Sequence, residues 1–412
     1  MMGLLCRVIL AQATLAPMTE EDVLRRAREA NAKLPQASLE IQAADEKVRE
    51  SRADRWMKVA IEGSFLYAPP GGYDPVVTNA GEARLQAVAR QPLLDGGAHR
   101  AAIDRAMADR EAAAARFRVA QKDLDVEIRS RLAELAAASA EISVRRAGID
   151  RLSRYRTTLR SRKASGQGVA ADLLKTDVRL ASDEADAIEA ESRAAEARAE
   201  LNVLMARPPG EPLEISGGIS SSPGSVAPGD SSLPEVAEAE ALARGADADL
   251  QTARAERRLH LSASADAGWW GADTTRWGID RWRKDAGFSF GLQVSLLLFD
   301  FGATDARIAR AKLDGRRARL EIAARRREAE LARAKAAATA GALRREIEVL
   351  SRAEPSARDS YLEAESRYRG GAAPALEVID AYAAAVDASV KLAQARSRLR
   401  IAEALEERWG AP

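Results

Sequence analysis

The strongest constraint on the fold is that the chain contains one pattern twice. A junction reading PLLDGG carries Asp95 and Gly97, and a junction reading LLLFDFG carries Asp300 and Gly302. Each pair is separated by the same 205 residues (300 − 95 and 302 − 97). The same offset places SGQGVAADLLKTD on GGAAPALEVIDAY, well downstream of the junctions. Two landmarks that keep one offset without a gap indicate a tandem duplication.

Each repeat has the same expected plan: a short helical segment, two strands and a long helical hairpin. The first repeat covers residues 19–207 and the second covers 234–412, with a connector rich in Pro, Gly and Ser at 208–233. The expected segments are a helix around 19–58, strands at about 59–68 and 82–92 and a hairpin at 97–207, then a helix around 234–258, strands at about 259–270 and 287–298 and a hairpin at 302–409. The first helix of each hairpin would reach on the order of 100 Å, because an α-helix rises about 1.5 Å per residue.

Glycines mark the points where the two hairpins reverse direction. These expected turn residues are Gly166 and Gly168 in the first repeat and Gly370 and Gly371 in the second. Glycine adopts the left-handed backbone conformation that ends many helices.

Composition excludes several classes of function. The 63 basic and 62 acidic residues are interspersed, so no segment has the basic surface expected of a nucleic-acid-binding protein. Cys6 is the single cysteine, and His99 and His260 are the two histidines. They form neither a disulfide framework nor a Cys/His zinc cluster.

The DFG at Asp300 to Gly302 matches a short motif of protein kinases, in which the Asp holds magnesium. A kinase also needs a glycine-rich phosphate loop, a strand lysine and a catalytic loop, and the sequence contains none of these. We therefore expect no enzymatic activity and no cofactor. The duplication instead makes Asp300 and Asp95 junction residues that cap the helices that follow.

The strands have features of membrane strands. Phe288, Phe290, Leu292 and Val294 alternate with polar or small residues, and no apolar run is long enough for a membrane helix. Tryptophans gather in the loop from Trp269 to Gly287, as they do at membrane interfaces. The strands alone fit equally well a sheet that packs on helices. Four strands cannot close a membrane barrel, so a barrel would need several copies of the chain.

The N-terminal residues 1–18 resemble a secretory signal, although an atypical one. A short apolar stretch precedes the small-residue pattern AQA at Ala11 to Ala13, but Arg7 interrupts it. We expect this segment to direct export.

With these features together, the chain resembles the TolC-like outer-membrane efflux family. The resemblance rests on the doubled junction and on the stretch YRGGAAPALEVIDAYAAAVDASVKLAQARSRLRIAEALEERWG, and it extends from about residue 19 to Gly410. It implies a mainly α fold with membrane β-strands. Three copies would form one twelve-stranded outer-membrane β-barrel that continues into a periplasmic α-helical barrel.

The resemblance also implies roles for residues near the hairpin turns. Glu377 and Asp380 correspond to the acidic residues that line the family's periplasmic constriction. Asp172 and Tyr368 correspond to residues that hold the closed state. Lys175 corresponds to Asp380 in the other repeat, and it would contribute to the closed state by pairing with an acidic neighbour instead. Ala373 stands where the family usually has a basic residue, so the closed-state contacts would be built differently here.

The function implied is a passive exit duct in the outer membrane of a Gram-negative bacterium, gated at the hairpin turns. Its expected partners are two further copies, a periplasmic adaptor, an inner-membrane pump and outer-membrane lipid. The alternative is a periplasmic coiled-coil scaffold without a channel, which leaves the alternating strands unexplained. The cargo stays open among drugs, metals, peptides and proteins.

Overall fold

The computed structural model describes residues 17–67, 81–165, 170–216, 233–272 and 286–410. Several sequence-based expectations lie outside these ranges: nearly all of the signal segment, the turn residues Gly166 and Gly168, most of the 208–233 connector, and Trp277 and Trp282.

The described residues form two compact units. Unit 1 comprises Met1–Gln36, Arg118–Leu233 and Arg327–Pro412, and unit 2 comprises Ala37–Phe117 and Pro234–Arg326. Each unit takes a part of both repeats. The duplication in the sequence is therefore not a division into two separate domains.

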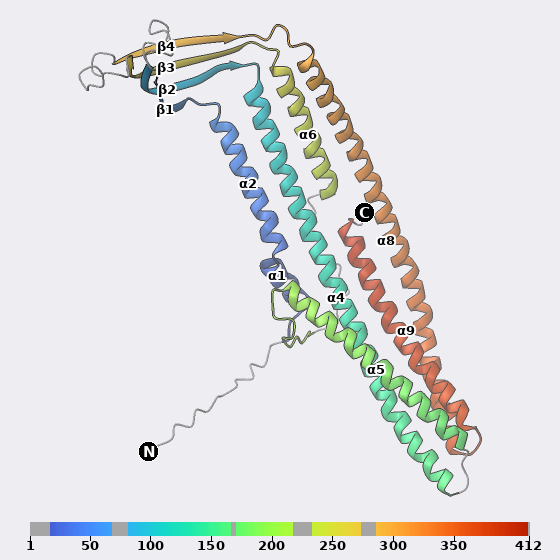
Figure 1. Cartoon of the computed structure of the whole chain (residues 1–412). Coiled ribbons are helices and arrows are strands. Elements are labelled where there is room, and N and C mark those ends of the chain that lie inside the picture. The colour runs from blue at the N-terminus through green and yellow to red at the C-terminus, as the bar shows by residue number, and fades with distance from the viewer. Residues whose placement is uncertain (1–16, 68–80, 166–169, 217–232, 273–285, 411–412) are drawn as a thin grey trace, which may run out of the picture. The chain divides into compact units, whose positions relative to one another are not determined.

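Unit 2 contains one antiparallel sheet in the order β1-β2-β3-β4 (Figure 1). Its strands are β1 (Lys58–Tyr67), β2 (Gly81–Asp95), β3 (His260–Ala272) and β4 (Ala286–Ser295). The pairing of β2 with β3 joins the first repeat to the second. Within the described residues, β1 and β4 are the edges of the sheet.

The strand registers repeat the duplication. Lys58 pairs with Arg90 between β1 and β2, as His260 pairs with Ser295 between β3 and β4. Arg90 and Ser295 are 205 residues apart (295 − 90), which is the offset of the junctions, and Lys58 and His260 are 202 apart (260 − 58). The two strand pairs are therefore equivalent residue by residue.

Two strand ends differ from the expected ones by three residues each (298 − 295 and 95 − 92). The last strand was expected to reach residue 298, but β4 ends at Ser295, which pairs with His260, the first residue of β3. Conversely, β2 extends past 92 to Asp95, where His260 still pairs with it. The register shifts between Pro92 and Leu94, since a proline has no N–H to give to the ladder.

Ion pairs between neighbouring helices of unit 2 show that the helices follow the order of the strands. They involve α2 (Lys33–Ala53), α4 (Ala98–Ala164), α6 (Pro234–Ala255) and α8 (Ala303–Arg369). Arg110 of α4 pairs with α2, Arg116 of α4 pairs with α6 at 2.6 Å, and Arg319 of α8 pairs with α6 at 2.8 Å.

The two strand-to-helix junctions have the same caps. Asp95 accepts a hydrogen bond from the Gly97 N–H at 2.9 Å and another from the N–H of His99. Asp300 accepts from the Gly302 N–H at 3.2 Å and from the Thr304 N–H at 2.7 Å. Each carboxylate satisfies N–H groups at the start of a 67-residue helix, so Asp300 has a structural role.

Both junctions also have the same backbone. Gly96 and Gly97 have φ angles of 65° and 96°, and Phe301 and Gly302 have φ angles of 53° and 89°. A left-handed conformation costs a residue with a side chain roughly 1 kcal/mol, so Phe301 is strained where the first repeat has glycine.

Unit 1 contains α1 (Glu20–Ala30), α5 (Ala170–Leu204), α9 (Ala375–Arg408) and the later parts of α4 and α8. The sequence predicts one helical segment over 19–58, whereas the structure has α1 and α2. Asn31 separates them with an extended backbone, because its side-chain amide donates to the carbonyl of Leu204 at 3.3 Å and accepts from the N–H of Lys33.

The core of unit 1 beside the hairpin turns, called the turn core below, joins all four long helices. Its buried residues are Leu152, Leu159, Leu180, Tyr361, Ala364, Tyr368, Ala375, Val378, Tyr382, Val386 and Val390. Tyrosines supply much of the volume of the turn core, and their hydroxyl groups require polar partners within it.

Candidate functional site: the hairpin turns and the polar network beside them

The second hairpin turn ends α8 with a Schellman motif. Gly371 has a φ angle of 77°, its N–H bonds the carbonyl of Tyr368 at 3.0 Å, and the Ala372 N–H bonds that of Arg367 at 2.8 Å. This pair of bonds satisfies carbonyls that the helix end leaves free. Gly370 and Gly371 thus form a tight turn, and α9 begins within a few residues.

The two acidic residues expected at the constriction have different surroundings. Glu377, in the first turn of α9, accepts a hydrogen bond from the Arg367 guanidinium at 2.7 Å and is largely neutralised by it. Asp380 is exposed one turn later and has no ion-pair partner among the described residues. Of the two carboxylates, only that of Glu377 is paired with a cation among the described residues.

The residues expected to hold the closed state do not all meet. Tyr368 is buried, with its ring edge-to-face on Tyr155 at 5.1 Å and under the Arg162 guanidinium at 4.5 Å. Asp172 lies in the first turn of α5. Lys175 is exposed and, within the described ranges, forms no ion pair. In this structure Tyr368 is thus held by α4.

Tyr155 links these groups. Its hydroxyl donates to the carbonyl of Ala375 at 3.4 Å. Burial raises the pKa of Tyr155 far above its usual value, and Tyr368 and the charge of Asp172 raise it further. The Tyr155 side chain is therefore a neutral hydrogen-bonding group at any physiological pH.

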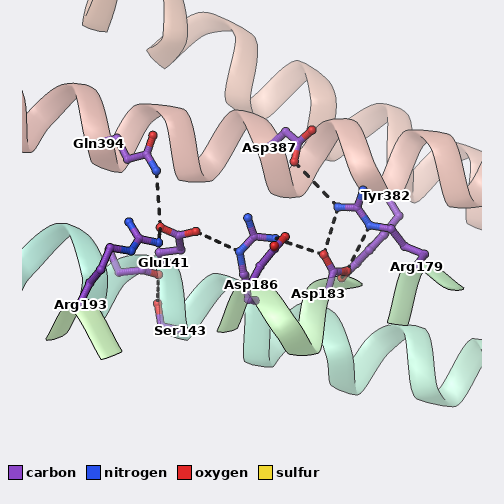
Figure 2. A network of polar contacts seen from close by, with 11 residues as sticks. Glu141, Ser143, Arg179, Asp183, Asp186, Arg193, Tyr382, Asp387 and Gln394 are labelled. Atoms are coloured by element: carbon purple, nitrogen blue, oxygen red, sulfur yellow. Dashed lines mark hydrogen bonds and ion pairs between the residues drawn. The ribbon is translucent and has the colours of Figure 1, made fainter. Parts of the chain in front are cut away.

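A buried polar network lies farther from the turns and joins α4, α5 and α9 (Figure 2). Its centre is Asp183 of α5, which is fully buried. Its carboxylate accepts from Arg145 of α4 at 3.2 Å, from Arg179 at 3.1 Å and from the Tyr382 hydroxyl of α9 at 2.8 Å. The cations and the hydroxyl offset the cost of burying this charge.

A second carboxylate extends the network along α4 (Figure 2). Glu141 is also buried and accepts from Arg145 at 3.1 Å and from Arg193 of α5 at 2.9 Å. The side chain of Gln394 of α9 lies 3.5 Å from the same carboxylate. Arg145 thus bridges Glu141 and Asp183, and both acids are shared among three helices.

The network depends on a glycine in the middle of α4. A Cβ atom built at Gly148 would lie 2.2 Å from the Tyr382 hydroxyl oxygen and 3.1 Å from the neighbouring ring carbon. Any larger residue at this position would displace the Tyr382 ring. The lack of a side chain at Gly148 therefore leaves the space that the Tyr382 hydroxyl needs to reach Asp183.

Sequence reasoning missed this network. The pairs Glu141–Arg145 and Arg179–Asp183 have the four-residue spacing of helix ion pairs, but exposed pairs such as Glu321–Arg325 have the same spacing. The signal that could distinguish them is an acid and a base set among alanines and leucines on the buried face of a helix.

Other kinds of site have no support in the described residues. Within these ranges, no three His, Cys, Asp or Glu side chains are grouped as metal ligands would be. None of the described helices combines the length and the apolar character that crossing a membrane requires.

Several solved structures share this fold. VceC of Vibrio cholerae is 19% identical, with a TM-score of 0.81, and the match covers 95% of this chain and 96% of VceC. The MtrE channel of Neisseria gonorrhoeae is 18% identical, with a TM-score of 0.80, covering 95% of this chain and 89% of MtrE. The CmeC channel of Campylobacter jejuni is 14% identical, with a TM-score of 0.82, covering 94% of this chain and 85% of CmeC.

No curated protein matches the sequence. The family model described as "outer membrane efflux protein" matches residues 23–207 and 231–411, which is most of the chain and includes both repeats. Members of this family are exit ducts of efflux systems and not enzymes, which removes the kinase interpretation of Asp300. The chain belongs to the outer membrane efflux protein family.

Proposed function

We propose that the chain works as a homotrimer in which twelve strands close one outer-membrane barrel and the long helices form a periplasmic tunnel. The sheet supports this, because β1 and β4 have no partner strand among the described residues and carry exposed apolar side chains. Unpaired strand edges are not tolerated in lipid, so further copies must pair with them.

The duct would serve a system with a periplasmic adaptor and an inner-membrane pump in a Gram-negative bacterium. The structures of CmeC and MtrE are described as outer-membrane channels, and the MtrE structure is described as an open state. An open state of MtrE supports gating as a property of the fold. No observation favours a coiled-coil scaffold, and the strands and the family argue against it.

We place the gate of this chain at the turn end of unit 1. The ring of Asp380 side chains, together with Glu377, would favour cations at the constriction. Tyr368, Asp172 and Lys175 would contribute to the closed state at the turns. The turn expected at Gly166 and Gly168 lies outside the described residues.

The observation that carries the gating proposal is the buried bond between Tyr382 and Asp183. It ties α9 of one repeat to α5 of the other, and Arg145 ties both to α4. Helices that share one buried carboxylate cannot separate without leaving that charge unpaired, which is costly. The network would therefore favour the closed arrangement until an adaptor stabilises the open one.

Conductance in a planar lipid bilayer tests this proposal. We expect Asp183→Asn and Tyr382→Phe to raise the open probability of the purified trimer. Asp359→Asn, at an exposed position on α8, should leave it unchanged. Equal open probability in all variants would show that the network does not contribute to gating. No conductance in any of them would contradict the proposal that the chain forms a duct.

A further inference from the structure

The junction between β2 and α4 has a close neighbour in the same chain. A Cβ atom at Gly96 would lie 2.7 Å from the Arg258 Cβ and 2.7 Å from the Ala255 carbonyl oxygen. The Arg258 guanidinium also donates to the Gly96 carbonyl at 2.7 Å. The end of α6 and the residues just before β3 therefore pack directly against this junction.

At the equivalent junction between β4 and α8, no described residue packs on Phe301 as Arg258 packs on Gly96. Phe301 takes the place of Gly96 and is 92% exposed. Its described ring contact is with Phe299 beside it, at 4.7 Å. An exposed aromatic side chain held in a strained backbone is a costly feature for an isolated chain.

The duplication identifies what the missing neighbour would be. The end of α6 at Ala255 corresponds to the end of α2 at Ala53, at the same 202-residue offset as β3 and β1 (255 − 53). Arg258 then corresponds to Trp56 (258 − 202), which is 72% exposed. Because β1 and β4 are opposite edges of the sheet, a Trp56 placed at Phe301 as Arg258 is placed at Gly96 would come from another copy.

We propose that Trp56 of a second copy of this chain packs on Phe301 and Phe299, and that this aromatic contact forms the subunit boundary at the strand-to-helix junction. The proposal rests on the proposed trimer and names the side chains that join its copies. At the junction inside the chain Arg258 packs on Gly96, whereas at the junction between copies Trp56 would pack on Phe301 and Phe299.

The presence of Phe301 at the position that Gly96 holds in the first repeat has a geometric reason. With the spacing found at Gly96, the Cβ of Phe301 would collide with the neighbouring chain, because 2.7 Å is too short for any Cβ contact. The second copy must therefore stand farther away than α6 does. Aromatic rings fill such a gap, since ring pairs are favourable with centroids about 4.5–7 Å apart.

The strand registers agree with this placement. Applying the β2–β3 register to β4, to the residues that follow it and to the β1 of the second copy sets Leu292 opposite Phe65, Leu296 opposite Ile61 and Asp300 opposite Lys58. The first two pairs unite side chains that are exposed and apolar in the single chain, and the third unites opposite charges. Cross-strand pairs of both kinds stabilise a sheet.

Photo-crosslinking of the full chain in lipid nanodiscs tests the contact. With p-benzoylphenylalanine in place of Phe301, we expect covalent dimers and trimers whose crosslinks map by mass spectrometry to residues 53–58 of another copy. The same probe in place of Phe288, at the other end of β4, should give no crosslink to residues 53–58.

A second measurement keeps the outcome clear if the probe disturbs folding. Trp56→Ala should lower the temperature at which the trimer dissociates, whereas Leu39→Ala, which changes an exposed side chain on α2, should not. A trimer by native mass spectrometry with position 301 crosslinked only to lipid or to its own chain would overturn this contact and leave the duct standing. A monomeric chain would overturn both.

Discussion

The hydroxyl group of Tyr382 donates a 2.8 Å hydrogen bond to the carboxylate of Asp183, and the two residues belong to different repeats. Asp183 is fully buried, so its charge depends on this hydroxyl and on Arg145 and Arg179. The buried polar network of unit 1 is therefore shared between the two repeats.

Removing this hydroxyl should destabilise unit 1. We expect Tyr382→Phe to lower the free energy of unfolding by about 2 kcal/mol, which is typical for a hydrogen bond to a charged group. The ring would keep its packing in the turn core. Thermal unfolding followed by circular dichroism measures the effect. Tyr361→Phe is the control, because the Tyr361 ring packs edge-to-face on Tyr382 without a bond to Asp183. An equal loss in both variants would contradict the role of the hydroxyl.

The ionisation of Tyr382 gives a dependence on alkaline pH. Burial, and then the charge of Asp183 and the hydrogen bond to it, raise the pKa of Tyr382 above the usual value of about 10. The folded state therefore favours the neutral phenol. The contribution to stability is complete below pH about 10 and is lost as the pH rises toward the folded-state pKa.

Tyrosinate absorbance during alkaline titration tests this dependence. The wild-type chain should keep a group of phenols that ionises only together with unfolding, and Tyr382→Phe should reduce its amplitude by one residue. If the late-ionising amplitude is the same in both proteins, Tyr382 does not titrate as the structure implies.

Gly148 and Gly341 offer opposite outcomes for the same substitution in the middle of a helix. Gly148→Ala should destabilise the chain by about 1–3 kcal/mol, because the new Cβ would meet the Tyr382 hydroxyl at 2.2 Å. Among the described residues, no side chain or distant backbone atom lies within 4 Å of a Cβ at Gly341, so Gly341→Ala should stabilise α8 by about 0.5–1 kcal/mol. Equilibrium denaturation compares the two, and a stabilised Gly148→Ala variant would contradict the packing.

The sequence predicts the repeated elements well where the chemistry is local. Asp300 and Gly302 specify a capped turn by themselves, and the long helices need only uninterrupted helix-forming residues between two glycine turns. The duplication supports each of these predictions, because a signal that is weak in one repeat recurs in the other.

The remaining features depend on partners far away in the sequence. The break at Asn31 is set by a carbonyl at Leu204, and the last residue of β4 pairs with the first residue of β3. Likewise, Tyr382 meets Asp183 across 199 residues, although each looks like an ordinary helix residue. No local pattern contains this information.

The cap at Asp300 gives a test of its structural role. Its carboxylate accepts from the Thr304 hydroxyl at 2.5 Å as well as from the backbone, and these bonds lower the pKa of Asp300. Asp300→Ala should lower the unfolding temperature, while Asp300→Asn should retain most of the wild-type value because its amide oxygen still accepts. An unfolding temperature for Asp300→Ala equal to that of the wild type would show that the cap is dispensable.

The pairing of Arg367 with Glu377 refines the expected selectivity of the constriction. Arg367 neutralises Glu377 at 2.7 Å, while Asp380 has no ion-pair partner in the described part of the chain. In reversal-potential measurements across a salt gradient, Asp380→Asn should therefore reduce cation selectivity more than Glu377→Gln does. Arg367→Ala should raise selectivity, because it releases one carboxylate in each copy.

Two further variants isolate the ion pair. Arg369→Ala is the matched control, since Arg369 pairs with Glu365 within α8 and not with α9. The double change Arg367→Ala with Glu377→Gln should return selectivity close to the wild-type value, because it removes opposite charges together. If Arg367→Ala and Arg369→Ala shift the reversal potential equally, the effect comes from total charge at the turn and Glu377 does not face the ion path.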